Sequence, residues 1–343
     1  MLRSLRSALL LGSAFLFFNF QFLIFHSLSH AQLVKAVDAV GMTVADMDRS
    51  MDFYTKILSF EKISDTEVYG NEYEKLQAVF GARMRVARMK LGDETIELTQ
   101  YLAPEGRPIP DDWRSNDHSF QHIAIVVNDM DKAYQHLRAH KIRHASTGPQ
   151  TIPAENKAAA GIRAFYFKDP DGHYLEIIYF PMGKGDPRWQ ENRQKLFLGI
   201  DHTAIVVSST QNSLKWYRDL LGMRLAGESM NHGSEQEHLN NVAGARLHIS
   251  GLRALRGPGI EFLEYLTPRN GRRAPRDTQA NDLWHWQTTM ATADAAKAFQ
   301  KIGAGAGRIV SSAVAQIPAG SLPFTRGFLA RDPDGHGLQL IEK

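Results

Sequence analysis

The sequence predicts an α+β protein with two tandem domains, each made of two β-α-β-β-β units. Three observations support this: an internal repeat, strand and helix patterns in the same order in each half, and matching turns. The segment Asp169–His173, Asp-Pro-Asp-Gly-His, recurs 163 positions later as Asp332–His336, and Phe53-Tyr54 recurs as Trp216-Tyr217 at the same spacing. A near-constant spacing over more than a hundred residues indicates two copies of one domain.

The repeat predicts domains over 36–180 and 198–343, with a linker over 181–197. The linker begins with Pro181 and runs through Gly183 and Gly185 to Pro187. Two prolines and two glycines within seven residues disfavour both helix and sheet.

Within the first domain, short β-branched apolar runs predict strands, and the first strand of each unit is followed by a helical pattern. Met51, Tyr54 and Leu58 share one helical face, as Met130, Ala133 and Leu137 do in the second unit. Strands are predicted over 37–44, 61–69, 83–91, 95–101, 121–128, 162–167 and 174–179. The Asp-Pro-Asp-Gly segments fall between the last two strands of their units, where Pro and Gly favour a tight turn.

The first 31 residues have the layout of a secretory signal peptide. Arg3 and Arg6 precede an almost wholly apolar stretch over 8–25, and Ser29-His30-Ala31 supplies small residues for cleavage. We therefore expect an exported protein, periplasmic or secreted, with no membrane contact after cleavage. A retained membrane anchor is the competing interpretation, since 18 residues is close to the shortest span of a bilayer.

Composition narrows the chemistry further. The 343 residues carry a net charge of only +3, with 40 Lys and Arg against 37 Asp and Glu, which gives no sign of a nucleic-acid surface. Cysteine is absent, so disulfides, thiolate metal sites and thiol nucleophiles are excluded. Any metal must be held by His, carboxylate or amide groups.

The paired units, a His on the first strand of a unit, a Glu on the fourth and the Asp-Pro-Asp-Gly turns together resemble the vicinal oxygen chelate superfamily. This group contains glyoxalases, bleomycin-resistance proteins and extradiol dioxygenases. The resemblance covers essentially all of 36–343. It implies that each domain curls into an eight-stranded mixed sheet with outer helices, around a cleft that holds a divalent metal such as Fe, Mn, Zn or Ni.

The resemblance also implies one metal ligand from the first and one from the fourth strand of each unit. In the first domain, Ala39 stands at one such position and cannot bind a metal, so the set reduces to Glu97, His122 and Glu176. The second domain offers a full set: His202, Glu261, His285 and Gln339. The second cleft is therefore the leading candidate for the active one, and the first cleft is the alternative.

The apolar surroundings of these residues agree with a metal. Glu261 lies in the run Ile260–Leu263 and Glu176 lies between Leu175 and Ile177. A carboxylate in such a strand is costly to bury without a partner. Two carboxylates and two imidazoles meeting at a cation would remove that cost.

The leading hypothesis is an exported metal-dependent enzyme acting on a small molecule with vicinal oxygens. Its chemistry would be that of a glyoxalase-like lyase or isomerase, with Glu261 or Glu97 as the general base, or that of a ring-cleaving dioxygenase if the metal is iron. The alternatives are a metal-free small-molecule-binding protein of the bleomycin-resistance type and a structural protein whose clefts have lost their function. The loops over 148–161 and 314–324 are the candidates for lids over the clefts.

Overall fold

The strands fall into four consecutive β-α-β-β-β units, called units I to IV here. A computed structural model describes residues 32–343 apart from 192, 193 and 306, so the predicted signal segment 1–31 lies outside the described residues. Every strand predicted in the first domain is confirmed, three of them with unchanged bounds. Among the described residues, none of the helices combines the length and apolarity needed to span a bilayer.

Units I and II fill the first half of the chain. Unit I (34–103) consists of β1 (Val34–Thr43), α1 (Met47–Asp52), β2 (Glu61–Tyr69), α2 (Asn71–Gln77), β3 (Arg83–Leu91) and β4 (Glu94–Ala103). Unit II (121–179) consists of β5 (Gln121–Val127), α3 (Met130–Ala139), β6 (Arg143–His144), β7 (Gln150–Thr151), β8 (Arg163–Lys168) and β9 (Tyr174–Tyr179). The segment between units II and III contains a short 3₁₀ helix, Pro187–Gln190.

Units III and IV repeat this order. Unit III (197–267) consists of β10 (Phe197–Val206), α4 (Thr210–Leu214), β11 (Arg224–Asn231), α5 (Ser234–Asn240), β12 (Arg246–Arg253) and β13 (Gly259–Thr267). Unit IV (286–342) consists of β14 (Trp286–Thr292), α6 (Ala295–Gly303), β15 (Arg308–Ile309), β16 (Ala315–Gln316), β17 (Arg326–Arg331) and β18 (Gly337–Glu342). Helices α1 and α4 each continue as a π-helical turn, Phe53–Ile57 and Lys215–Leu220.

Local sequence accounts for the ends of these elements. Asp129 caps the N-terminus of α3 by accepting a hydrogen bond from the Lys132 amide, and Asp294 caps α6 in the same way. In the turn before β9, Asp169 accepts hydrogen bonds from three successive backbone amides. Gly172 in that turn has φ of 103°, which favours glycine.

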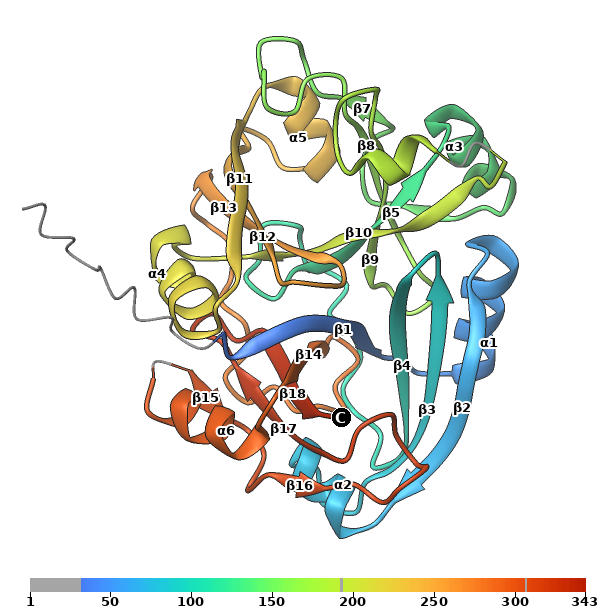
Figure 1. Cartoon of the computed structure of the whole chain (residues 1–343). Helices are drawn as coiled ribbons and strands as arrows, with labels where there is room; N and C mark the ends of the chain where they lie inside the picture. The colour runs from blue at the N-terminus through green and yellow to red at the C-terminus, as the bar shows by residue number, and fades with distance from the viewer. Residues whose placement is uncertain (1–31, 192–193, 306) are drawn as a thin grey trace, which may run out of the picture. The chain divides into compact units, whose positions relative to one another are not determined.

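The strands form two mixed nine-stranded sheets, and neither sheet belongs to one repeat. Sheet A joins units I and IV in the order β15-β17-β18-β14-β1-β4-β3-β2, with β16 beside β17. Sheet B joins units III and II in the order β11-β12-β13-β10-β5-β9-β8-β6, with β7 beside β8. In Figure 1, β1 (blue) accordingly runs next to β14 of the C-terminal unit, with β18 on the far side of β14.

This arrangement corrects the expectation that each tandem domain closes its own eight-stranded sheet. The α+β class, the four units and the mixed sheets are as predicted, but the first strands pair between repeats: β1 with β14 and β5 with β10. Units of the same repeat meet instead through side chains. Met42, Tyr54 and Leu98 of unit I share one buried cluster with Phe165 and Ile177 of unit II.

The exchange of partners makes a testable prediction about fragments. Residues 32–190 contain units I and II, in which β1 would lose its partner β14 and β5 its partner β10, so that each strand exposes one unpaired edge. We expect this fragment alone to dimerise or aggregate, and mixing it with 194–343 to give a 1:1 complex. Size-exclusion chromatography with light scattering measures both outcomes. A monomeric 32–190 fragment that unfolds cooperatively would contradict the exchanged sheets.

Candidate metal centre

Four ligand-type side chains meet on one face of sheet B, called its inner face here. They are His122 on β5, Glu176 on β9, His202 on β10 and Glu261 on β13. Nε2 of His122 lies 2.9 Å from Oε2 of Glu176, and Nε2 of His202 lies 3.7 Å from the same oxygen. Nε2 of His202 is also 3.6 Å from Oε1 of Glu261. Ligand atoms of His122, Glu176 and His202 all lie within 4.8 Å of one another.

Strand register explains why these four side chains share a face. Ala204 is the neighbour of both His122 and Glu261 across its two flanking strands. Two residues further along each strand, Ala124 is the neighbour of both His202 and Glu176. Each alanine thus separates an imidazole from a carboxylate, and its small side chain leaves the space above the sheet to the charged groups.

The group is buried, and three of its four imidazole nitrogens lack hydrogen-bond partners among the described residues. His122 is fully buried, and neither of its ring nitrogens, nor Nε2 of His202, has a hydrogen-bond partner of acceptable geometry among the described residues. The side chain of Glu261 is 26% exposed, so the group opens to solvent on that side. Buried polar atoms without partners are rare in folded proteins and call for an explanation.

Electrostatics couples the members of the group. Burial lowers the pKa of His122 although Glu176 opposes the change, and burial raises the pKa of Glu261 although His202 opposes it. Burial alone would also lower the pKa of His202, but the charges of Glu261 and Asp201 outweigh it and raise that pKa to about 9.

Asp201 fixes the orientation of His202. Its Oδ2 lies 2.9 Å from Nδ1 of His202, so this ring nitrogen is the hydrogen-bond donor and Nε2 is left facing the group. Arg253 donates to both carboxylate oxygens of Asp201 at 2.8 and 2.9 Å, and Trp189 donates to Oδ1 at 3.2 Å. A carboxylate behind a ligating imidazole is the usual arrangement at protein metal sites.

These residues fit a divalent metal. Two imidazoles and two carboxylates are borderline and hard donors that suit Fe, Mn, Zn or Ni. A cation placed among them would give a partner to Nε2 of His122 and to Nε2 of His202, and would balance two neighbouring carboxylates at once. His122, Glu176, His202 and Glu261 are therefore the residues that could hold it.

The structure does not assemble the candidate ligands by repeat. The set Glu97, His122 and Glu176 is divided, because Glu97 lies on sheet A and the other two lie on sheet B. The set His202, Glu261, His285 and Gln339 is divided too, because His285 and Gln339 lie in or next to unit IV. The reason is the exchange of strand partners: residues of one repeat do not face a common sheet.

Sheet A carries a different group at the corresponding positions. There Gly41 is the neighbour of Glu97 and Gln287, and Thr289 is the neighbour of Ala39 and Gln339. Amide groups replace ligands: Gln77 and Gln287 both donate to Oε1 of Gln339, at 3.0 and 3.2 Å.

Arg88 takes the place of a free cation on sheet A. It is the cross-strand neighbour of Glu97, as Gly251 is of Glu261. Its guanidinium lies 3.8 Å from Oε2 of Glu97 and 3.0 Å from Oδ2 of Asp38. Burial raises the pKa of Glu97, and the charge of Arg88 opposes that change.

His285 precedes β14 and does not occupy a ligand position of either sheet, although its Nε2 lies 3.3 Å from Oε1 of Gln287. Gln287, not His285, corresponds to His122, because Gln287 lies opposite Gly41 as His122 lies opposite Ala204. Burial and the charge of Arg331 lower the pKa of His285 to about 3.

A local signal in the sequence could have corrected this assignment. The pair Asn116-Asp117 recurs as Asn281-Asp282, and the helix-capping Asp129 recurs as Asp294, both at a spacing of 165 rather than 163. Two extra residues before this region shift the match from His285 to Gln287. The roles of Asp201, Arg88 and Gln77 also escaped the sequence, since each depends on contacts between distant strands.

Relatives of known name match parts of the chain. A 2-epi-5-epi-valiolone epimerase from an Actinomyces species is 34% identical over 168 residues, covering 47% of this chain and 87% of the relative. A lactoylglutathione lyase from Arabidopsis thaliana is 24% identical over 182 residues, which is 53% of each chain. The chain thus spans about half the length of that plant relative.

Solved structures match almost the whole chain at low identity. Glyoxalase I from Zea mays superimposes with a TM-score of 0.57 at 16% identity, covering 90% of this chain and 92% of the other. A putative dioxygenase from Bacillus subtilis gives a TM-score of 0.54 at 13% identity, covering 91% and 86%. At these identities the likeness concerns the fold.

One family model accounts for most of the chain. It is described as the Glyoxalase/Bleomycin resistance protein/Dioxygenase superfamily, and it matches residues 36–177 and again 199–340. These two ranges correspond to units I and II and to units III and IV. With two copies of its domain in one chain, the protein belongs to the Glyoxalase/Bleomycin resistance protein/Dioxygenase superfamily.

Proposed function

We propose that this protein is a metal-dependent isomerase or epimerase that moves a proton at a carbon next to a carbonyl group of a small molecule with vicinal oxygens. The observation that carries the proposal is the group on sheet B, in which two buried imidazoles with partnerless nitrogens face two carboxylates. The relatives named as an epimerase and a lactoylglutathione lyase support this class of chemistry.

A divalent metal held by His122, Glu176, His202 and Glu261 would polarise a substrate carbonyl and so acidify the neighbouring carbon. Glu261 is the residue that moves the proton. It is the most exposed of the four, so a substrate can reach its carboxylate, which can take up a proton and return it. Asp201 holds His202 in place while the charge of Glu261 changes.

Ring-cleaving dioxygenase chemistry is less compatible with this donor set. Oxygenases of the non-haem iron type use two His and one carboxylate, which leaves three positions of an octahedral metal open. Here a second carboxylate, Glu261, stands beside the two histidines and Glu176, and its partly exposed side chain suits proton transfer at a substrate carbon. Glu97, the other candidate base, lies on sheet A beside Arg88 and is not part of this proposal.

We also propose that the protein acts outside the cytosol. The basic head, apolar stretch and small residues of segment 1–31 support export. Export would make thiol adducts formed in the cytosol poor candidates for the substrate.

The metal assignment predicts which histidines matter. In protein purified without affinity-tag metal, we expect about one equivalent of metal, lost in His122→Ala and in His202→Ala but retained in His285→Ala. Elemental analysis measures this directly, and circular dichroism verifies that each variant is folded. Metal lost in His285→Ala and retained in His122→Ala would contradict this assignment. It would support the ligand set of the second repeat, which contains His285. If no form holds metal, even after reconstitution, the metal-dependent enzyme is contradicted and a metal-free small-molecule-binding protein is favoured.

The role of Glu261 predicts a loss of proton exchange. In D₂O, the metal-loaded protein is expected to exchange the carbon-bound hydrogen of small 2-hydroxyketones, and Glu261→Gln should slow this exchange about 10²- to 10⁴-fold. Nuclear magnetic resonance follows the exchange, with the metal content measured on the same samples. Glu97→Gln is the matched control and should keep the wild-type rate. Unchanged exchange in Glu261→Gln with its metal still bound would remove Glu261 as the base.

The ion pair between Arg88 and Glu97 leads us to predict a structural role for the group on sheet A. Arg88→Met leaves the buried Glu97 without its cation, which should cost about 3–5 kcal/mol in the free energy of unfolding. The double variant Arg88→Met/Glu97→Leu should regain most of this loss. Arg83→Met removes an exposed pair with Glu67 and should cost less than about 1 kcal/mol. Urea unfolding measures all three, and equal costs for Arg88→Met and Arg83→Met would contradict the role.

A further inference from the structure

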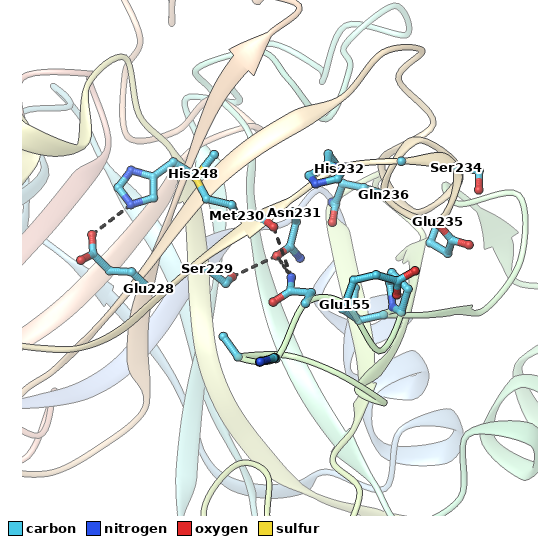
Figure 2. A pocket seen from close by; sticks show the side chains of 16 residues that line it. Glu155, Glu228, Ser229, Met230, Asn231, His232, Ser234, Glu235, Gln236 and His248 are labelled. Atoms are coloured by element: carbon cyan, nitrogen blue, oxygen red, sulfur yellow. Dashed lines mark hydrogen bonds and ion pairs between the residues drawn. The ribbon is translucent and has the colours of Figure 1, made fainter.

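A cavity of about 730 Å³ lies along the edge strand β11 of sheet B. It is bounded by β11, by the start of α5 and by residues 152–158 of the loop between β7 and β8. Figure 2 shows the side chains of Asn231, His232 and Gln236 gathered between the strand and the helix, with Glu155 on the facing loop. The cavity is large enough for a small molecule.

The loop crosses from one edge of sheet B to the other. It belongs to unit II, yet Nδ2 of Asn156 donates to Oδ1 of Asn231 at 2.8 Å and to the Met230 carbonyl at 3.3 Å, both on β11 of unit III. Helix α5 supports the crossing, because Ser146 donates to the Leu239 carbonyl at 2.6 Å. The loop that the sequence marked as a candidate lid thus contacts β11, at the far edge of sheet B.

The charged side chains that line the cavity are mostly acidic. Glu155, Glu228 and Glu235 contribute three carboxylates against one ammonium group, that of Lys157. Its remaining hydrogen-bonding side chains are the amides and hydroxyls of Asn156, Asn231, Gln236, Ser229 and Ser234 and the imidazoles of His232 and His248. Among the described residues that line it there is no Phe, Tyr or Trp.

This lining selects a class of ligand. Carboxylates accept hydrogen bonds, amides both donate and accept, and a hydroxyl group of a ligand does both. The excess of negative charge opposes a ligand with phosphate or several carboxylate groups. Because no aromatic side chain lines it among the described residues, the cavity offers no stacking partner to a flat hydrocarbon ring.

A strip without side chains connects the cavity with the metal group. Across sheet B, Glu261 is the neighbour of Gly251, and Gly251 is the neighbour of Gly227 on β11. A Cβ placed on Gly227 would meet nothing within 4 Å, and one on Gly251 only the Gly227 carbonyl, at 3.9 Å. Ser229, which lines the cavity, is two residues beyond Gly227 and therefore points to the same face. On sheet A, Arg88 and Ser64 fill the corresponding positions.

We propose that this cavity binds the hydroxyl groups of a polyhydroxylated, uncharged or cationic small molecule, whose carbonyl end extends over Gly227 and Gly251 to Glu261. The identity of the carbonyl end rests on the proposed function; the binding of the hydroxyl groups does not. Asn231 and Asn156 hold the ligand together with the loop, and Glu228 and Glu235 select against anions.

Methionine methyl resonances test the cavity without any assay of activity. Met230 lines the cavity and is 39% exposed, and Met230→Leu identifies its signal in ¹³C-methyl-labelled protein. We expect myo-inositol and D-glucosamine, at millimolar concentrations, to shift this signal, whereas S-methylglutathione and catechol leave it in place. Asn231→Leu should weaken the binding of both polyols at least fivefold. A shift with catechol or S-methylglutathione at lower concentration, or none with either polyol up to 100 mM, would overturn the proposal.

Two further variants separate the parts of the argument. Glu228→Gln/Glu235→Gln should weaken the cationic D-glucosamine more than the neutral myo-inositol, whereas Glu72→Gln, at the matching position of α2, should change neither. An equal effect on both polyols would show that these two carboxylates do not select ligands by charge. His202→Ala should keep the polyol binding after losing metal, so failure of the metal assignment and failure of the cavity assignment give different results.

Discussion

The antiparallel pairing of β5 with β10 is the constraint on which the metal group depends. This pairing brings two first strands side by side, each carrying one imidazole, and places an alanine opposite each imidazole. A slip of one residue would turn His202 to the opposite face of the sheet, away from Glu176, because successive side chains of a strand alternate. The outer strands β9 and β13 then add one carboxylate each, next to those alanines.

The two sheets solve the same electrostatic problem in opposite ways. Both bury a carboxylate on the fourth strand of a unit, Glu261 on sheet B and Glu97 on sheet A. On sheet A the compensating cation is a side chain of the chain itself, Arg88, and amides replace the other ligands. On sheet B a glycine, Gly251, stands at the position of Arg88, so the carboxylate of Glu261 remains open to a cation from outside the chain. Gene duplication thus left one inner face closed and one open.

Much of the fold follows from local patterns in the sequence. The strands Glu61–Tyr69, Arg83–Leu91 and Tyr174–Tyr179 begin and end where apolar runs and turn residues predict. The choice of strand partners does not follow, because β1 can hydrogen-bond to β5 or to β14 with the same apolar faces buried in either case. Only the three-dimensional structure distinguishes the two arrangements.

The residues of the candidate site could be predicted from the sequence, but their grouping could not, because it depends on the choice of strand partners. His122, Glu176, His202 and Glu261 all stand out in the sequence, each as a polar residue in an apolar strand. Their grouping was wrong, since it assumed that repeats close upon themselves and that one spacing holds throughout. Sequence patterns do not predict the roles of Asp201, Arg88 or the glycines Gly227 and Gly251, because these roles depend on neighbours in other strands.

The strand exchange also sets an order for the folding of the nascent chain. Strand β5 meets its partner within about 80 positions, since Ala204 lies opposite His122, whereas Ala39 must wait for Thr289, 250 positions later. Closing a longer loop costs more conformational entropy and slows folding. Sheet B can form while unit IV is still being synthesised, but β1 keeps an open edge until the last unit arrives. Strand β1, although it stands at the start of unit I, is therefore among the last strands to be paired. Its open edge is the one in greatest need of protection from other chains.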